Sequence, residues 1–159
     1  MNLFVSDRRP TESARALADR HVVKMTVETA QILWSAVHLS APGRVLPGAY
    51  RPTHLGHPFV RWAAATRANF EWAVAHGFAL SAEYGHRYGR WHVSWVAIMG
   101  AAAMDDCIAN GGLTPFALAM DDDLRDEGDP HGSYRRCLSR KYAAWGSMAR
   151  WTRRDPPTW

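Results

Sequence analysis

The sequence predicts an all-α fold built as one compact domain over residues 1–159, with a short N-terminal arm and an irregular C-terminal tail. Three observations support this prediction. Apolar residues recur at helical spacings of three and four over several long segments, whereas the alternation typical of strands is almost absent. Hydrophobic residues make up 47% of the chain and charged residues 21%, which is typical of a globular protein. A length of 159 residues suits a single domain with its own core.

The first long element is a helix that we expect over Thr11–Ser40, because no Gly or Pro interrupts this segment. The preceding Ser6–Pro10 is a helix-entry signal with proline in the first turn. Met1–Val5 is short and apolar, so it is either a brief strand or an arm tucked against the body. Pro42-Gly43 ends the helix, and the frequent Gly and Pro of residues 43–57 predict a loop.

Further helices are expected along the rest of the chain. One begins at Pro58, reaches about His76 and continues to Tyr88, and another covers residues 91–109, where Asn110-Gly111-Gly112 ends it. Residues 114–120 form a short helix in this prediction, and Gly132–Trp145 is the last clear helix. The prolines and glycines between these segments predict connections without strands, which completes the all-α assignment.

Charge is distributed unevenly along the chain. Residues 121–129 hold six acids and one arginine, which leaves 18 basic against 9 acidic residues elsewhere, an excess of +9. A body with this excess suits a polyanion, and we expect double-stranded DNA as the partner, although a basic protein kept soluble by its charge has the same composition. No apolar run approaches the roughly 20 residues of a membrane span.

The compartment is expected to be cytoplasmic and the protein monomeric. The N-terminus places a short apolar run before its charges, which is the opposite of the order in a signal peptide. Cys107 and Cys137 lie far apart and in no metal-ligand spacing, so reduced thiols are expected and a disulfide framework is not.

One polar stripe stands out on the first long helix, whose other residues are mostly apolar. Its members recur at spacings of three and four: His21, Lys24, Glu28, Gln31, Ser35 and His38. A solvated face with a Lys24–Glu28 pair is one interpretation. The other is a cleft, because a buried helix tolerates a polar seam only where the seam is paired or faces solvent. In a cleft, Glu28 would be an acid or base tuned by Lys24 and His21, and these three are our candidate catalytic residues.

Short motifs in this helix and beyond it carry a resemblance. Leu17-Ala18-Asp19-Arg20-His21 is followed by Glu28 seven residues after the histidine, Gly56-His57 opens a later helix, and Pro157-Thr158-Trp159 closes the chain. In this order they resemble the pyrimidine-dimer DNA glycosylases of the phage endonuclease V type and related small phage and bacterial proteins. The clearest similarity covers about a dozen residues, and the weaker motifs span most of the chain.

The resemblance implies a compact helical fold, cleavage of the base–sugar bond, and Glu28 in the place of the family's catalytic glutamate. The family's nucleophile is the α-amine of an N-terminal threonine, whereas this chain begins Met1-Asn2 and has a longer segment, Ser6–Ser13, before the motif. We therefore expect the longer segment to place the amine away from the sugar. Water oriented by Glu28 is then the nucleophile, in a monofunctional DNA glycosylase that leaves an abasic site, on a damaged or hypermodified pyrimidine.

Candidate DNA contacts flank this helix. Arg8 and Arg9 are candidates for phosphate contacts, with solvated loop arginines as the alternative. Val27 and Gln31 stand where the family has arginines, and Gln31 is kept as a substrate contact. The remaining candidates for base or phosphate contact lie on the loop and at the start of the next helix: Tyr50, Arg51, His54, His57 and Arg61.

No metal or cofactor is expected. His54-x-x-His57 has no Cys or acidic residue near it in sequence, and no Gly-rich phosphate loop is present. Two alternatives remain open at this point. One is a DNA-binding protein without catalysis, which would not need Glu28. The other is an enzyme of related fold that transfers a group to a nucleotide or base.

Overall fold

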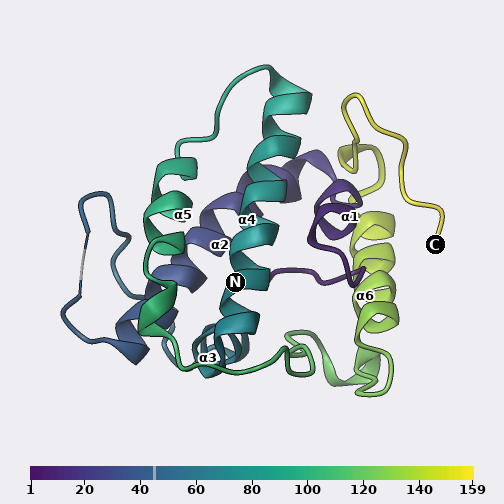
Figure 1. Ribbon diagram of the computed structural model, residues 1–159. Helices are drawn as coiled ribbons and strands as arrows, with labels where there is room; N and C mark the ends of the chain where they lie inside the picture. The colour runs from purple at the N-terminus through teal and green to yellow at the C-terminus, as the bar shows by residue number, and fades with distance from the viewer. Residues whose placement is uncertain (45) are drawn as a thin grey trace.

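The computed structural model describes residues 1–44 and 46–159 and shows an all-α fold (Figure 1). Within these residues the chain forms no strand. The α-helices are α1 (Pro10–Arg15), α2 (Asp19–Ser40), α3 (Pro58–Ala65), α4 (Arg67–Tyr88), α5 (Trp95–Ala102) and α6 (Pro130–Trp145). Short 3-10 turns are η1 (Asp105–Cys107), η2 (Asp122–Leu124) and η3 (Gly146–Met148).

The core lies around α2 and α4, the two helices of 22 residues. These helices pack against each other, α3 and α5 each contact both of them, and α1 packs on α4. Gly77 of α4 permits the close approach of the layers, because a Cβ there would lie 3.1 Å from side-chain carbons of Thr29 on α2 and Ile98 on α5. None of the helices described is long and apolar enough to cross a membrane.

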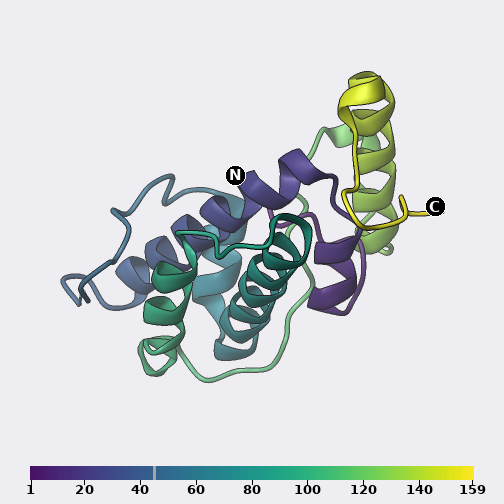
Figure 2. The same ribbon diagram turned by 90° about the horizontal axis from the view of Figure 1, so that it is seen from above.

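Helix α6 stands at one side of this core, and the N-terminal arm runs between the two (Figures 1 and 2). The arm is no strand but a buried irregular segment, with Leu3 and Val5 fully buried. Its carbonyl groups accept hydrogen bonds from both sides: Arg135 Nε of α6 donates to Ser6 O (2.9 Å), and Trp72 Nε1 of α4 donates to Arg8 O (3.0 Å). The arm therefore joins α6 to the helical core.

Several predicted helix boundaries were wrong, because contacts with distant residues override the local pattern. The helix expected over residues 11–40 breaks at residues 16–18, where the N–H of Ala18 donates to the Tyr142 hydroxyl of α6 (3.0 Å). The helix expected from Pro58 onward breaks at Thr66, whose hydroxyl accepts from Asn69 N (3.2 Å) and caps α4.

The later helices also differ from the prediction. The segment expected to be helical over residues 91–109 contains only α5 and η1, and residues 114–120 are not helical. There, the Tyr134 hydroxyl donates to Ala117 O (2.7 Å) and accepts from Ala119 N (3.0 Å), which holds the segment extended over the core. Helix α6 begins at Pro130, two residues earlier than expected, with Asp129 accepting from Gly132 N (2.9 Å).

The loop and the tail agree with the prediction. Residues 43–44 and 46–57 contain no helix, and residue 45 of the expected loop lies outside the described residues. The tail from Arg150 to Trp159 is irregular.

Candidate functional site

Glu28 lies in the middle of α2, buried, and its carboxylate is shared by three nitrogen donors. Oε2 accepts a hydrogen bond from the backbone N–H of Asn2 (2.9 Å) and lies 3.9 Å from the amino nitrogen of Met1. Oε1 lies 3.3 Å from Lys24 Nζ, one turn earlier on the same helix. The buried arm folds back and brings the Met1 amine to this carboxylate, although the segment before the motif is long.

A cavity of about 390 Å³ opens beside Glu28, and we call it the Glu28 cavity. The arm, α2 and α6 supply its walls. The lining residues are Met1, Asn2, Phe4, Arg20, His21, Lys24, Met25, Glu28, Lys141 and Trp145. Four of these carry a positive group and one a carboxylate, so the cavity is cationic. The Lys24–Glu28 pair predicted for a solvated face exists, but it lies at the wall of this cavity, with only Lys24 exposed.

His21 lies in this wall as a buried neutral ring. Its Nδ1 is 3.0 Å from the Tyr142 hydroxyl, and its ring packs 4.6 Å from the rings of both Phe4 and Trp145. Burial lowers the pKa of His21 to about 3, and the nearby charges of Lys141, Lys24 and Arg20 act in the same direction. At neutral pH His21 is therefore uncharged and does not act as an imidazolium acid, and its ring packs as part of the aromatic wall.

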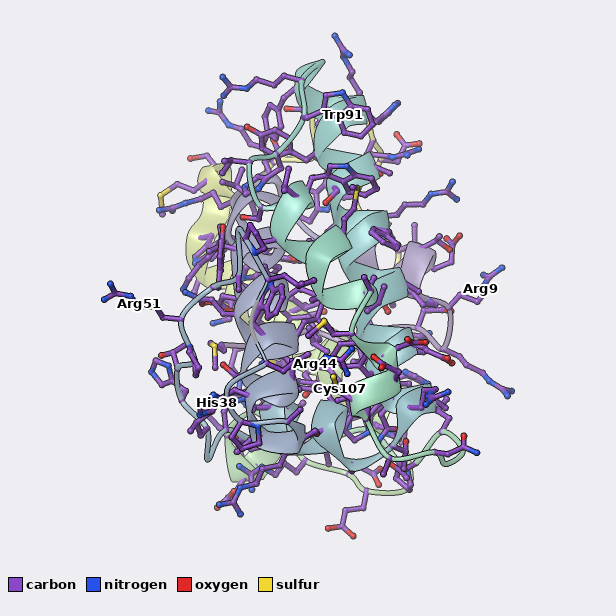
Figure 3. All side chains as sticks on the ribbon, turned by 60° about the vertical axis from the view of Figure 1, so that its left-hand side comes forward. Arg9, His38, Arg44, Arg51, Trp91 and Cys107 are labelled. Atoms are coloured by element: carbon purple, nitrogen blue, oxygen red, sulfur yellow. The ribbon has the colours of Figure 1, made fainter. Side chains whose placement is uncertain are left out.

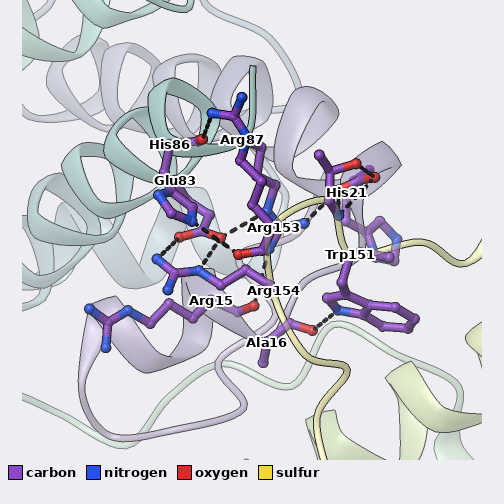
Figure 4. Close-up of polar contacts among 12 residues, drawn as sticks. Arg15, Ala16, His21, Glu83, His86, Arg87, Trp151, Arg153 and Arg154 are labelled. Atoms are coloured by element: carbon purple, nitrogen blue, oxygen red, sulfur yellow. Dashed lines mark hydrogen bonds and ion pairs between the residues drawn. The ribbon is translucent and has the colours of Figure 1, made fainter. Parts of the chain in front are cut away.

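Asp19, the acidic residue of the motif before His21, belongs to a buried hydrogen-bond network. Its carboxylate accepts from Arg87 Nη1 of α4 (2.9 Å) and from the hydroxyl and N–H of Thr152 in the tail (2.8 and 3.0 Å). Arg87 is fully buried and also donates to Glu83 (2.8 Å), as Figure 4 shows. This network fixes the start of α2 against α4 and the tail, and it thereby sets the register of His21 and Glu28.

The start of α3 meets the same site from the other side of Met1. His57 caps α3, with Nδ1 accepting from Phe59 N (3.2 Å). Burial and the positive N-terminus lower the pKa of His57, while hydrogen bonding to the Met1 backbone opposes the shift. Arg61 folds back toward Gly56, where its Nη2 would lie 3.9 Å from a Cβ. His57 is therefore a neighbour of the site, and Arg61 lies close to the turn that precedes α3.

The other predicted contacts are not gathered at the Glu28 cavity. The hydroxyl of Tyr50 is 2.9 Å from Ser94 Oγ, at the start of α5, so Tyr50 anchors the loop. Arg8, Arg9, Arg51 and His54 are exposed and line no part of the cavity. Arg9 and Arg51 point away from the molecule on opposite sides (Figure 3).

The far half of the polar stripe is covered by the loop. Ser35 Oγ donates to Thr53 O and accepts from Thr53 N, both at 3.0 Å. Gln31 is half-buried between this contact and Glu28 and does not line the cavity. Only the N-terminal half of the stripe, from His21 to Glu28, is therefore accessible from the cavity.

Acidic residues of the segment 121–129 form ion pairs with arginines of helix α6. Asp123 pairs with Arg140, and Asp129 lies 3.7 Å from Arg136, so two arginines of α6 are neutralised by it. Lys141 is the next residue on α6 and lines the cavity instead. Two charges of the predicted basic excess are therefore paired with this segment, whereas Arg20 and Lys141 at the cavity are not.

Neither the α6 wall of the site nor the closeness of the Met1 amine to Glu28 was predicted from the sequence. Arg20 lies inside the recognised motif, but nothing in the sequence indicates that Lys141 and Trp145 face it across more than a hundred residues. Among the described residues, no group of three or more His, Cys, Asp or Glu side chains is placed to hold a metal ion. No known family model, curated protein or solved structure matches the chain.

Proposed function

We propose that the protein is a DNA glycosylase that excises a damaged or modified pyrimidine, with Glu28 as the catalytic carboxylate and the α-amine of Met1 as the nucleophile. The observation that carries this proposal is the shared carboxylate: Glu28 Oε2 lies 3.9 Å from the Met1 amine, inside a cationic cavity. The size of this cavity falls within the range of small-molecule sites, and its positive charge suits a nucleotide extruded from duplex DNA.

The reaction uses these groups as follows. The unprotonated amine attacks C1′ of the extruded nucleotide, the bond between C1′ and the base breaks, and the departing base takes a proton from water. The positive charge that develops on the sugar is stabilised by Glu28, which also accepts a proton from the new C–N ammonium. The proton held by Glu28 then passes to the ring oxygen O4′ as the C1′–O4′ bond breaks, which opens the sugar and gives an imine. Water hydrolyses this imine to an abasic site, or the imine allows strand cleavage by β-elimination.

Lys24 orients the carboxylate rather than attacking the sugar. Its ammonium lies 3.3 Å from Glu28 Oε1, whereas the arm contacts the other carboxylate oxygen, Oε2. Lysine ammonium groups have an ordinary pKa of about 10.4 and α-amino groups one of about 8, so at neutral pH an α-amine supplies far more of the unprotonated nucleophile than a lysine beside a carboxylate does. The sequence led us to expect water as the nucleophile. The Met1 amine takes that role in the proposed reaction, because the arm brings it to Glu28.

The test compares Glu28→Gln with a matched surface control, Glu12→Gln. Glu12 lies on α1 and, among the residues that the structure describes, pairs only with the exposed Arg15 (3.0 Å). Both variants are incubated with ultraviolet-damaged DNA and with phage DNA carrying hypermodified pyrimidines, and alkali-revealed breaks are scored. We expect Glu28→Gln to bind DNA like the unchanged protein and to release base at least ~100-fold more slowly.

The control should behave as the unchanged protein does. Base release by Glu28→Gln at the unchanged rate would remove this carboxylate from the mechanism. DNA binding without base release from any substrate by the unchanged protein would favour a non-catalytic DNA-binding protein.

A further inference from the structure

Two cations of the Glu28 cavity have no acidic partner among the described residues, Arg20 and Lys141. The Arg20 guanidinium lies over the Trp145 ring, 5.3 Å from its centre, and its Nη1 contacts the Met148 sulfur (3.3 Å). Lys141 Nζ lies 6.0 Å from the centre of the Phe4 ring. Aromatic and sulfur contacts position these cations but do not neutralise them.

Other cations of α6, unlike Lys141, lie beside acidic residues. Arg140 pairs with Asp123, and Arg136 lies near Asp129. Lys141 follows Arg140 directly in the chain, yet it points into the cavity and away from this acidic segment. The acidic residues thus neutralise the outer side of α6 and leave the cavity side positive.

The unpaired charges converge on one small volume. Lys141, Lys24 and Arg20 all act on the buried His21 ring and disfavour its protonated form. Glu28 is the single carboxylate in the lining, and it is already shared by the Met1 amine and Lys24. Like charges gathered in this way repel one another, and a bound anion relieves that repulsion.

We propose that Arg20 and Lys141, with Trp145 beneath the guanidinium, form a subsite for an oxyanion of the ligand that enters the Glu28 cavity. A planar guanidinium and a mobile ammonium together suit a phosphate or carboxylate group. Two sources carry this chemistry: the phosphodiester beside the extruded nucleotide, and an acidic substituent on a modified base. The subsite rests on the proposed function for its substrate, but its binding is measurable without catalysis.

The experiment measures binding by calorimetry for Arg20→Gln, Lys141→Gln and the control Arg140→Gln. Arg140 is the neighbour of Lys141 on the same helix, and it faces the acidic segment. One probe is a short thymidine oligonucleotide, compared with its uncharged methylphosphonate analogue. The other is the nucleoside 5-carboxy-2′-deoxyuridine, compared with thymidine. Circular dichroism confirms that each variant is folded.

We expect the unchanged protein to prefer at least one anionic probe over its neutral counterpart. Arg20→Gln and Lys141→Gln should each weaken that probe about tenfold, while the neutral counterpart and the control variant change little. The probe that responds identifies the source of the oxyanion. Absence of any preference for the anionic probes, or equal affinities in the variants and the control, would overturn the subsite. Retained anion binding without base release would instead overturn the proposed function alone.

Discussion

Acidification is expected to destabilise the protein through two buried neutral histidines, His21 and His76. His76 lies on α4, fully buried, with its ring stacked on Trp72 (5.3 Å) and its Nδ1 3.3 Å from Pro10 O. Burial lowers its pKa to about 4, and that of His21 to about 3. His21 also packs on the arm that carries Met1, since its ring contacts Phe4.

The size of this loss of stability depends on the difference between the folded pKa values and the pKa of a histidine in the unfolded chain, which is about 6.5. Below that value the unfolded chain binds a proton that the folded protein does not, so the free energy of unfolding falls as the pH falls. Since both folded pKa values lie below 5, each histidine removes about 2 kcal/mol between pH 7 and pH 5, about 4 kcal/mol for the pair. This stability is present above pH 6.5 and is lost toward pH 4.

The assay is urea unfolding followed by circular dichroism at pH 7 and pH 5. His76→Gln should lose about 2 kcal/mol less between the two pH values than the unchanged protein does. His54→Gln, a change at an exposed loop histidine, should keep the full pH dependence. Equal stability of the unchanged protein at both pH values, or the same pH dependence in His76→Gln, would refute the reasoning.

Two further substitutions test the network and the arm. Arg87→Met leaves the half-buried carboxylate of Asp19 and the buried carboxylate of Glu83 without their shared partner, so it should lower the free energy of unfolding by about 3 kcal/mol in the same urea assay. An unchanged midpoint would contradict the network. Changing Arg8 and Arg9 to alanine should weaken DNA binding on all sequences alike and make the salt dependence of binding shallower. Base release at saturating DNA should stay unchanged. An unchanged salt dependence would show that these arginines are solvated and do not contact phosphates.

The sequence predicted the parts of this molecule that depend on local pattern. The all-α class, the loop before α3 and the irregular tail follow from apolar periodicity and from Gly and Pro, and the structure confirms them. The contact between Lys24 and Glu28 was also predictable, because residues four apart share one helix face. These features need no knowledge of distant contacts.

The remaining features are set by residues far apart in sequence. The break between α1 and α2 depends on Tyr142, which lies 124 residues from Ala18. The α6 wall of the cavity depends on Lys141 and Trp145, and the sequence contains no local signal for their position. The amine reaches Glu28 because the arm is buried between α6 and the core. The short apolar sequence of the arm was compatible with either a strand or a tucked-in arm, so it did not predict this position.

The central claim is that the Met1 amine is the nucleophile at Glu28, and reductive trapping tests it most directly. Borohydride reduces an imine between protein and sugar to a stable amine, and an abasic duplex supplies the aldehyde whatever base is the natural target. The account predicts a covalent complex whose peptide map places the sugar on the α-amine of Met1, with trapping retained in Lys24→Arg. Absence of a complex, or an adduct on Lys24, would contradict the account.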